Sequence, residues 1–407
     1  MIHQNRRKEL LSQLDEGALV IISTNPEQLR NGDVHYPFRP HSDFWYLTGF
    51  TEPQAVAVFS KDTYTIFLRD KDPAREIWDG KRLGVSDAPQ ALKADKAYSI
   101  DELKTQLPKL IADATTLYYD FKPCTLDDEI IAYLPKTQYQ SLASYVHEMR
   151  LIKSDGEIEL MQKAADISVN AHQLAMWQTR ADLFEFEVAS VFDAEFRKNN
   201  AEHAYTPIVA GGENACVLHY IENNKILNDG DLLLIDAGCE VEGYASDITR
   251  TFPVNGTFSA AQRQIYQIVL DAQLAAIESI KPGVVVVKPH QIATHVIQQG
   301  LVDLGILQAD GDLSQFYMHG TGHYLGLDVH DVGAYQKNDQ HRQYEIGMVT
   351  TVEPGIYIRK DDKINPIYWD IGIRIEDDVL ITNSGNTVLT GALVKEIDDI
   401  ESLMREK

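Results

Sequence analysis

The chain has 407 residues, of which 44% are hydrophobic, and it carries 37 Lys and Arg against 61 Asp and Glu, a formal net charge of −24. This length predicts two domains, with three as an alternative, and the hydrophobic content is sufficient for sizeable cores. The acidic surplus argues against partners such as nucleic acid or an anionic membrane, because both require a basic surface.

Cysteine usage and hydropathy favour a cytoplasmic location. The three cysteines, Cys124, Cys216 and Cys239, form no CxxC or CxxH pair, so neither a thiolate zinc site nor a disulfide framework is expected. The first residues contain no apolar signal-peptide core. No apolar run reaches the length of about 18 residues that predicts a membrane-spanning helix.

Residues 1–150 are predicted to form an α/β domain. Four short β-rich segments, "ALVIIS" (18–23), "AVAVFS" (55–60), "YTIFL" (64–68) and "TLYYDF" (116–121), predict strands. Polar segments such as "DELKTQLPKLIADA" (101–114) predict helices between them. No glycine-rich phosphate-binding motif follows any of these strands, so nucleotide binding is not indicated.

Residues 151–407 are predicted to form a second, α+β domain. Ser154 and Glu157 have the spacing of a capping box at the start of a helix. Further helices are predicted at 259–280 and 290–305. Two strand pairs are predicted, "DLLLIDAG" with "DITRTFPV" and "MVTTVEPGIYI" with "GIRIEDDVLIT". Two helix-then-hairpin halves suggest a duplication, but their sequences are too different to identify a repeat.

Both predicted hairpins place carboxylates at strand ends. If the first turn is centred between Val241 and Glu242, Asp236 and Asp247 lie directly opposite, with Cβ atoms about 5 Å apart. Two carboxylates this close require either a raised pKa or a bound cation. Glu353 and Glu376 repeat this arrangement in the second hairpin.

The stretch "MHGTGHYLGLDVHDVG" (318–333) adds three histidines among glycines, with a short strand predicted at "GLDVH". A single acid in a strand is usually an edge residue that faces water, but four acids at strand ends together with these histidines indicate a metal site. An oxygen-rich ligand set suits Mn²⁺, with Co²⁺, Zn²⁺ or Fe²⁺ as alternatives. Four carboxylates are enough for two ions about 3.5–4 Å apart, a pair typical of hydrolases.

Seven segments spread over nearly the whole chain carry a family resemblance: "FRPHSDFWYLTGF", "VHEMRLIKS", "GGENACVLHY", "LLLIDAGCEVEGYASDITRTFPVNG", "HGTGHYLGLDVHDVG", "GMVTTVEPGIYI" and "GIRIEDDVLIT". They resemble segments of the Xaa-Pro aminopeptidases (aminopeptidase P), which are pita-bread metallopeptidases related to prolidase, methionine aminopeptidase and creatinase. The resemblance implies an α/β aminopeptidase P domain at 1–150 and an α+β pita-bread catalytic domain at 151–407. It also implies a homo-oligomer, either a dimer or a tetramer.

The activity that the resemblance implies is release of the N-terminal residue from peptides with proline in the second position, by attack of a metal-bridging hydroxide on the Xaa-Pro carbonyl. Prolidase, which cleaves only Xaa-Pro dipeptides, is an alternative with the same ligands. Methionine aminopeptidase normally lacks such an N-terminal domain. An inactive pita-bread binding protein or a creatinase-type enzyme would have lost the metal ligands.

The resemblance also assigns roles to individual residues. The five metal ligands would be Asp236, Asp247, His323, Glu353 and Glu376, with Asp247 and Glu376 bridging the two ions. Glu353 would also accept the proton of the attacking water. The substrate-side residues would include His219 and His330, which stabilise the tetrahedral intermediate and orient the residue after the scissile bond. The others would be His319, Arg374, Tyr357 and Asp33. Tyr357 and Asp33 would join the two domains. The remaining residues of interest, His172, His290, His295 and Cys216, are interpreted as structural.

Overall fold

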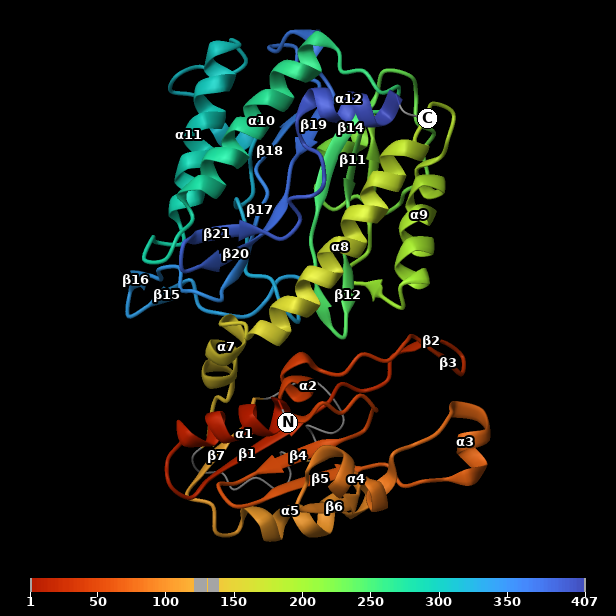
Figure 1. Cartoon of the computed structure of the whole chain (residues 1–407), viewed down its shortest axis with the longest axis vertical. Coiled ribbons are helices and arrows are strands. Elements are labelled where there is room, and N and C mark those ends of the chain that lie inside the picture. The colour runs from red at the N-terminus through yellow and green to blue at the C-terminus, as the bar shows by residue number, and fades with distance from the viewer. Residues whose placement is uncertain (1, 121–129, 131–138, 406–407) are drawn as a thin grey trace. The chain divides into compact units, whose positions relative to one another are not determined.

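The computed structural model describes residues 2–120, 130 and 139–405. It divides into two compact units, Met1–Met149 and Arg150–Lys407, each with its own core (Figure 1). Cys124 and the last predicted position of the strand at 116–121 lie outside the described residues.

The first unit is built around a six-stranded mixed sheet in the order β6-β5-β4-β1-β7-β8. The four predicted strands are confirmed as β1, β4, β5 and β7, which are buried on both faces apart from the half-buried first residue of β7. The strands are β1 (Ala18–Ser23), β2 (Leu29–Asn31), β3 (Val34–His35), β4 (Val56–Phe59), β5 (Tyr64–Leu68), β6 (Lys96–Ser99), β7 (Thr116–Tyr118) and β8 (Tyr139–Gln140). The helices are α1 (Ile2–Ser12), α2 (Ser42–Thr48), α3 (Pro73–Asp79), α4 (Gly84–Leu92) and α5 (Leu103–Ile111), with α7 (Ala143–Leu151) at the boundary.

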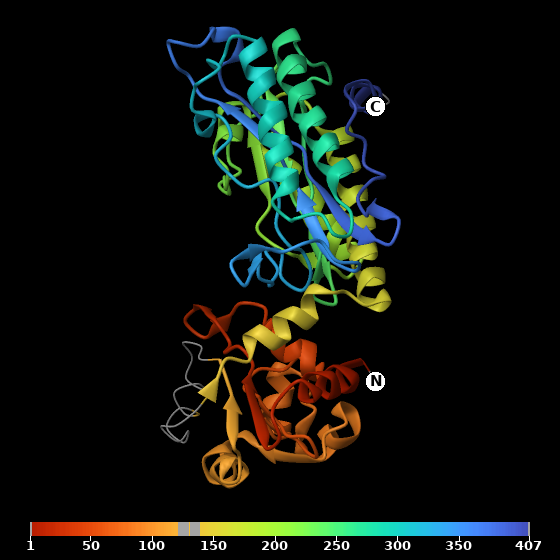
Figure 2. The ribbon, with the colours of Figure 1, turned by 90° about the vertical axis from the view of Figure 1, so that its left-hand side faces the viewer.

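Long helices cover the strands of the second unit. The capping box is confirmed, because the Ser154 hydroxyl and the Glu157 carboxylate both hydrogen-bond across the first turn of α8. Helix α8 packs on β12 and β13, α9 packs on β10, and α10 packs on β17, β18 and β19. Helices α10 and α11 lie side by side (Figure 2). The bounds are α8 (Asp155–Gln178), α9 (Glu185–Lys198), α10 (Ala260–Ser279), α11 (Lys288–Asp303) and α12 (Ile397–Arg405).

The strands of the second unit form several small antiparallel sheets. These are β10-β11-β14, β13-β12-β9, β17-β20-β21, β18-β19 and β15-β16. Their bounds are β9 (Glu202–His203), β10 (Ile208–Gly211), β11 (Leu232–Asp236), β12 (Cys239–Val241), β13 (Tyr244–Ala245), β14 (Thr249–Pro253), β15 (Gln336–Lys337), β16 (Gln340–His341), β17 (Val349–Val352), β18 (Gly355–Ile358), β19 (Ile371–Arg374), β20 (Asp377–Thr382) and β21 (Gly385–Val388). Both predicted strand pairs are confirmed.

The predicted turn of the first hairpin is wrong by one residue, and the pairing of its strands shifts with it. The turn forms at Glu242 and Gly243, both with positive φ, so Asp236 pairs with Thr249 and Asp247 lies diagonally across from it. A two-residue turn of this kind favours glycine, and Gly243 fixes its position. Asp236 and Asp247 are nevertheless neighbours, because the shift in pairing is even and keeps both on one face.

The strand predicted at "GLDVH" is also wrong, because residues 326–330 form bends with no ladder partner. The second hairpin agrees with the sequence prediction. Val352 pairs with Asp377 and Gly355 pairs with Arg374, so the continuing register places Glu353 opposite Glu376. No helix among the described residues is long and apolar enough to cross a membrane.

Candidate active site

A cavity of about 320 Å³ lies where the two hairpins of the second unit meet the histidine-rich segment. The cavity brings together all five predicted metal ligands and four of the predicted substrate-side residues. The lining residues among the predicted set are Asp236, Asp247, His323, Glu353, Glu376, His219, His319, His330 and Arg374. Residues from distant parts of the chain therefore form one polar pocket.

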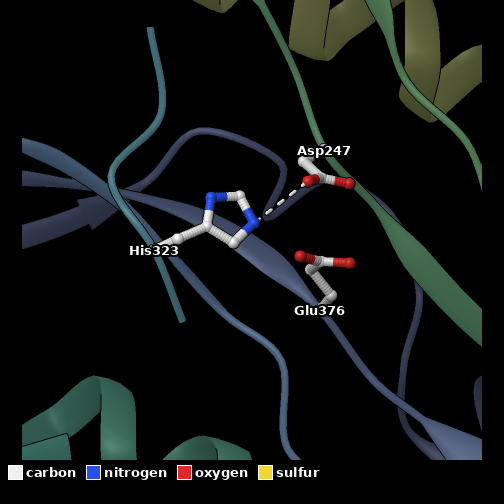
Figure 3. A group of neighbouring side chains, drawn as sticks. All are labelled: Asp247, His323 and Glu376. Carbon is white, nitrogen blue, oxygen red and sulfur yellow. Dashed lines mark ion pairs between the residues drawn. The ribbon is translucent and has the colours of Figure 1, made fainter. Parts of the chain in front are cut away.

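Three of these side chains are close enough to share one ion. A ligand atom from each of Asp247, His323 and Glu376 lies within 4.8 Å of the other two (Figure 3). His323 Nε2 is 3.4 Å from Asp247 Oδ2. The Thr249 hydroxyl donates to Glu376 Oε2 over 2.6 Å and fixes that carboxylate.

The other two predicted ligands lie beside this group. Asp236 Oδ2 accepts a hydrogen bond from Arg374 Nη2 at 2.5 Å. Glu353 Oε1 is 3.6 Å from His323 Nε2, and Glu353 Oε2 is 3.8 Å from His319 Nδ1. The carboxylates are thus arranged around His323 and Arg374.

Burial and mutual repulsion shift the protonation of these acids. Burial raises the pKa of Glu353 to about 7, against the charges of His323 and Arg374. Burial together with the charges of neighbouring acids also raises the pKa of Asp247 and of Glu376. Burial lowers the pKa of His323, but the hydrogen bond and charge of Asp247 outweigh it and raise the pKa to about 9. Such strongly perturbed groups in one cavity are typical of a functional site.

The donor set fits divalent cations. The Tyr205 hydroxyl lies 2.6 Å from Asp236 Oδ1 and 2.5 Å from Asp247 Oδ1, but it has only one proton to donate. The second carboxylate therefore needs a proton or a cation. Four carboxylates also outnumber the positive charges of Arg374 and His323, and carboxylate oxygens with one imidazole suit manganese and similar ions.

Three of the predicted substrate-side residues, His319, Tyr357 and Arg374, form a hydrogen-bonded chain. His319 Nε2 lies 2.8 Å from the Tyr357 hydroxyl, and that hydroxyl accepts from Arg374 Nη1 over 3.0 Å. Burial and then the charge of Arg374 lower the pKa of His319 to about 4, so this imidazole is neutral near neutral pH. The ring of His330 packs edge-on against that of His323, with centroids 4.3 Å apart. The Tyr357 hydroxyl thus links two residues of the pocket, His319 and Arg374.

Asp33 is placed differently from the other predicted residues. It lies in the first unit, between β2 and β3, and is exposed. Its role in a network that joins the domains stays a prediction. The structural interpretation of His172 is confirmed, because its buried ring hydrogen-bonds the carbonyl of Ala237. Burial raises the pKa of Cys216 to about 12, which agrees with an inert thiol.

Several residues with direct contacts to the predicted ligands were not predicted from the sequence, among them Tyr205, Thr249 and Asp378. Tyr205 contacts two of them, Thr249 holds Glu376, and the carboxylate of Asp378 accepts from the backbone N–H of Asp247 at 3.1 Å. The two-residue spacing of Thr249 from Asp247 and of Asp378 from Glu376 is the available signal, because residues i and i+2 share a face of a strand. No sequence signal marks Tyr205, which lies in the loop before β10.

Comparison with known proteins identifies the family. The profile of metallopeptidase family M24 matches residues 159–383, and that of the aminopeptidase P N-terminal domain matches residues 3–118. The chain belongs to metallopeptidase family M24. The predicted resemblance to aminopeptidase P and the predicted fold class, an α/β N-terminal domain followed by a pita-bread domain, are thereby confirmed.

Known relatives match this chain over nearly its whole length and over nearly the whole of their own. The Xaa-Pro aminopeptidase of Haemophilus influenzae is 48% identical over 98% of this chain and 96% of its own length. The Xaa-Pro aminopeptidase of Escherichia coli K12 is 43% identical over 98% of this chain and 97% of its own length. The structure of Pseudomonas aeruginosa aminopeptidase PepP superposes with a TM-score of 0.96 at 41% identity, covering 100% of this chain and 99% of that one. The structure of zinc-substituted E. coli aminopeptidase P in complex with product also superposes with a TM-score of 0.96 at 41% identity. That match covers 100% of this chain and 98% of the other. The chain is therefore a metal-dependent exopeptidase.

Proposed function

We propose that this enzyme releases the N-terminal residue from peptides whose second residue is proline. The observation that carries the proposal is the cavity in which four carboxylates and His323 converge, in a chain that matches Xaa-Pro aminopeptidases over nearly its whole length. We propose Asp236, Asp247, His323, Glu353 and Glu376 as the ligands of two divalent ions, Mn²⁺ first among them. When bound, the ions would polarise the scissile carbonyl and lower the pKa of water.

The protein side chains then move the protons. In this proposal Glu353 accepts a proton as water attacks the carbonyl carbon. The C–N bond breaks, and the same proton is passed to the secondary amine of the leaving proline. His219 and His330 border the cavity and would donate to the oxyanion of the tetrahedral intermediate. These two histidines would also orient the residue after the scissile bond. The neutral His319, held by Tyr357, would line the pocket beside them.

A preference for proline is chemically consistent with this site. Proline has no amide hydrogen and fixes φ, so enzymes that grip an extended substrate by its N–H groups lose a contact. A site that grips the carbonyl oxygen and the free amino terminus needs no such N–H. The specificity itself rests on the similarity to Xaa-Pro aminopeptidases.

The test is a substrate series with Xaa-Pro, Xaa-Pro-Xaa and Xaa-Ala-Xaa peptides, each with added Mn²⁺ and with a chelator. We expect cleavage of Xaa-Pro-Xaa, little cleavage of Xaa-Ala-Xaa, and loss of activity on chelation. Cleavage of the dipeptide alone would support prolidase instead. Full activity after exhaustive chelation, or absence of bound metal by elemental analysis, would overturn the metal assignment.

We further propose a cytoplasmic enzyme that is a homo-oligomer. The small number of cysteines, with no CxxC or CxxH spacing in the sequence, supports the location. On helix α3, Ile77 and Trp78 are 81% and 83% exposed, and adjacent large apolar side chains in water are typical of contact surfaces. Light scattering coupled to size-exclusion chromatography would distinguish monomer, dimer and tetramer.

A further inference from the structure

The segment that carries His323 and His330 lacks regular secondary structure. Between Gly322 and Gly333, strand-like pairing with the rest of the described chain is limited to the single bridge of Tyr324 with Thr350. Only a few backbone hydrogen bonds hold it, including Asp331 N to Tyr324 O at 2.8 Å. The Thr351 N–H donates to the His323 carbonyl at 2.9 Å and fixes His323, whereas His330 lies beyond these strand contacts and depends on neighbouring side chains for its position.

A buried ionic cluster provides that anchor. Asp331 Oδ1 accepts from Arg150 Nη2 over 2.5 Å, and Asp331 Oδ2 accepts from Lys153 Nζ over 3.0 Å. The three side chains are only 1% to 2% exposed. We call these three residues the Asp331 clamp. Buried ion pairs contribute little net stability, because desolvation offsets their attraction, so the clamp is better explained by the geometry that it imposes.

The clamp is packed closely against the segment that it holds. A Cβ added to Gly326 would lie 2.2 Å from Asp331 Oδ2 and 2.9 Å from Lys153 Cε, so only glycine allows this approach. The Gly326 carbonyl accepts from Ala245 N at 2.8 Å, which ties the segment to β13. The Lys153 N–H donates to Gly347 O at 2.8 Å, just before β17. The clamp is therefore fixed to the framework at both ends.

We propose that Asp331, held by Arg150 and Lys153, is the positioning residue for His330. Asp331 follows His330 directly in the chain, and the His330 ring packs on that of His323. Loss of the clamp frees the segment and displaces the imidazole from the substrate side of the cavity. The inference rests on the proposed function, which gives His330 its role in catalysis.

A double-mutant cycle tests this coupling. We expect Asp331→Asn to lower kcat about tenfold with metal content unchanged. Combined with His330→Ala it should add nothing to the loss that His330→Ala causes alone. Lys153→Met is the second variant, and it tests the clamp even if Asp331→Asn does not fold. It removes one positive charge and leaves Arg150 paired with Asp331, so the remaining pair has no net charge. Multiplicative losses in both cycles would overturn the proposal.

A matched control and a second measurement separate positioning from general damage. Asp328→Asn removes a 38% exposed carboxylate that also contacts Arg150, and it should change kcat less than about twofold. Hydrogen exchange of Lys153→Met should rise within residues 322–333 and stay unchanged elsewhere. Unchanged exchange in that segment would refute the clamp without any assay. Failure of the unaltered enzyme to cleave Xaa-Pro-Xaa would instead contradict the proposed function.

Discussion

Tyr205, in the loop before β10, places its hydroxyl 2.6 Å from Oδ1 of Asp236. The same hydroxyl lies 2.5 Å from Oδ1 of Asp247, so one phenol aligns two of the proposed ligands. We expect Tyr205→Phe to weaken metal binding by about 10- to 100-fold, because groups that orient metal ligands contribute on this scale. Titration of the metal-free protein with Mn²⁺ measures the effect. Unchanged affinity would show that the carboxylates are held without the phenol.

Glu353→Ala should abolish hydrolysis. The substitution removes a proposed ligand and the proposed proton acceptor, and loss of general-base catalysis alone lowers rates by about 100- to 10,000-fold. The rate of Xaa-Pro-Xaa cleavage and the metal content are measured together. Glu213→Ala, at a side chain that is 72% exposed, is the control and should retain activity. Substantial turnover by Glu353→Ala would remove this residue from the mechanism.

His330→Ala should lower turnover while leaving the metal content near that of the unaltered enzyme. This result is expected because His330 contacts the proposed ligand His323 through its ring and lies outside the close group of Asp247, His323 and Glu376. Elemental analysis of purified His330→Ala measures its metal content. A variant without metal would mean that the roles assigned to His323 and His330 are wrong.

Tyr357→Phe should lower kcat/KM by about tenfold without loss of metal. The hydroxyl links His319 to Arg374, and its removal leaves both groups with an unmade hydrogen bond in a buried site. Steady-state kinetics with Xaa-Pro-Xaa measures the change. The control is Tyr368→Phe, whose hydroxyl bonds Gln264 instead. Equal effects of the two substitutions would argue against a specific role for Tyr357.

His172 should make the enzyme less stable in mild acid. Burial lowers its pKa from 6.5 to about 4, so below pH 6.5 the unfolded chain takes up a proton that the folded chain does not bind. Its contribution is therefore present above pH 6.5 and is lost as pH falls towards 4, by up to about 3 kcal/mol. Urea unfolding at pH 7 and pH 5 should show a smaller difference for His172→Gln than for the unaltered protein. The exposed His295→Gln should behave like the unaltered protein; an equal pH dependence in all three would exclude His172 as the cause.

Much of the fold and the site can be predicted from local sequence. The strand at 18–23 and the capping box of Ser154 and Glu157 depend on apolar runs and on spacing within one turn, both visible in the chain itself. The acids at strand ends and the histidine-rich segment also indicate a metal site before any fold is known. The predictions fail at the first hairpin, where Gly243 sets the turn one residue later than predicted, and at residues 326–330, which contacts with distant parts of the chain hold.

The sequence by itself predicted which residues carry the proposed chemistry. The acids stand out because charged groups at the ends of apolar strands are costly unless they have a function, and the histidines stand out through the family resemblance. Only the tertiary structure decided how they meet. A turn at Glu242 and Gly243 pairs Asp236 with Thr249, and Tyr205 reaches two carboxylates from a separate loop. Arg150 and Lys153 enclose Asp331, about 180 residues away along the chain. Such long-range contacts arise from packing of elements that leave no periodic signal in the sequence.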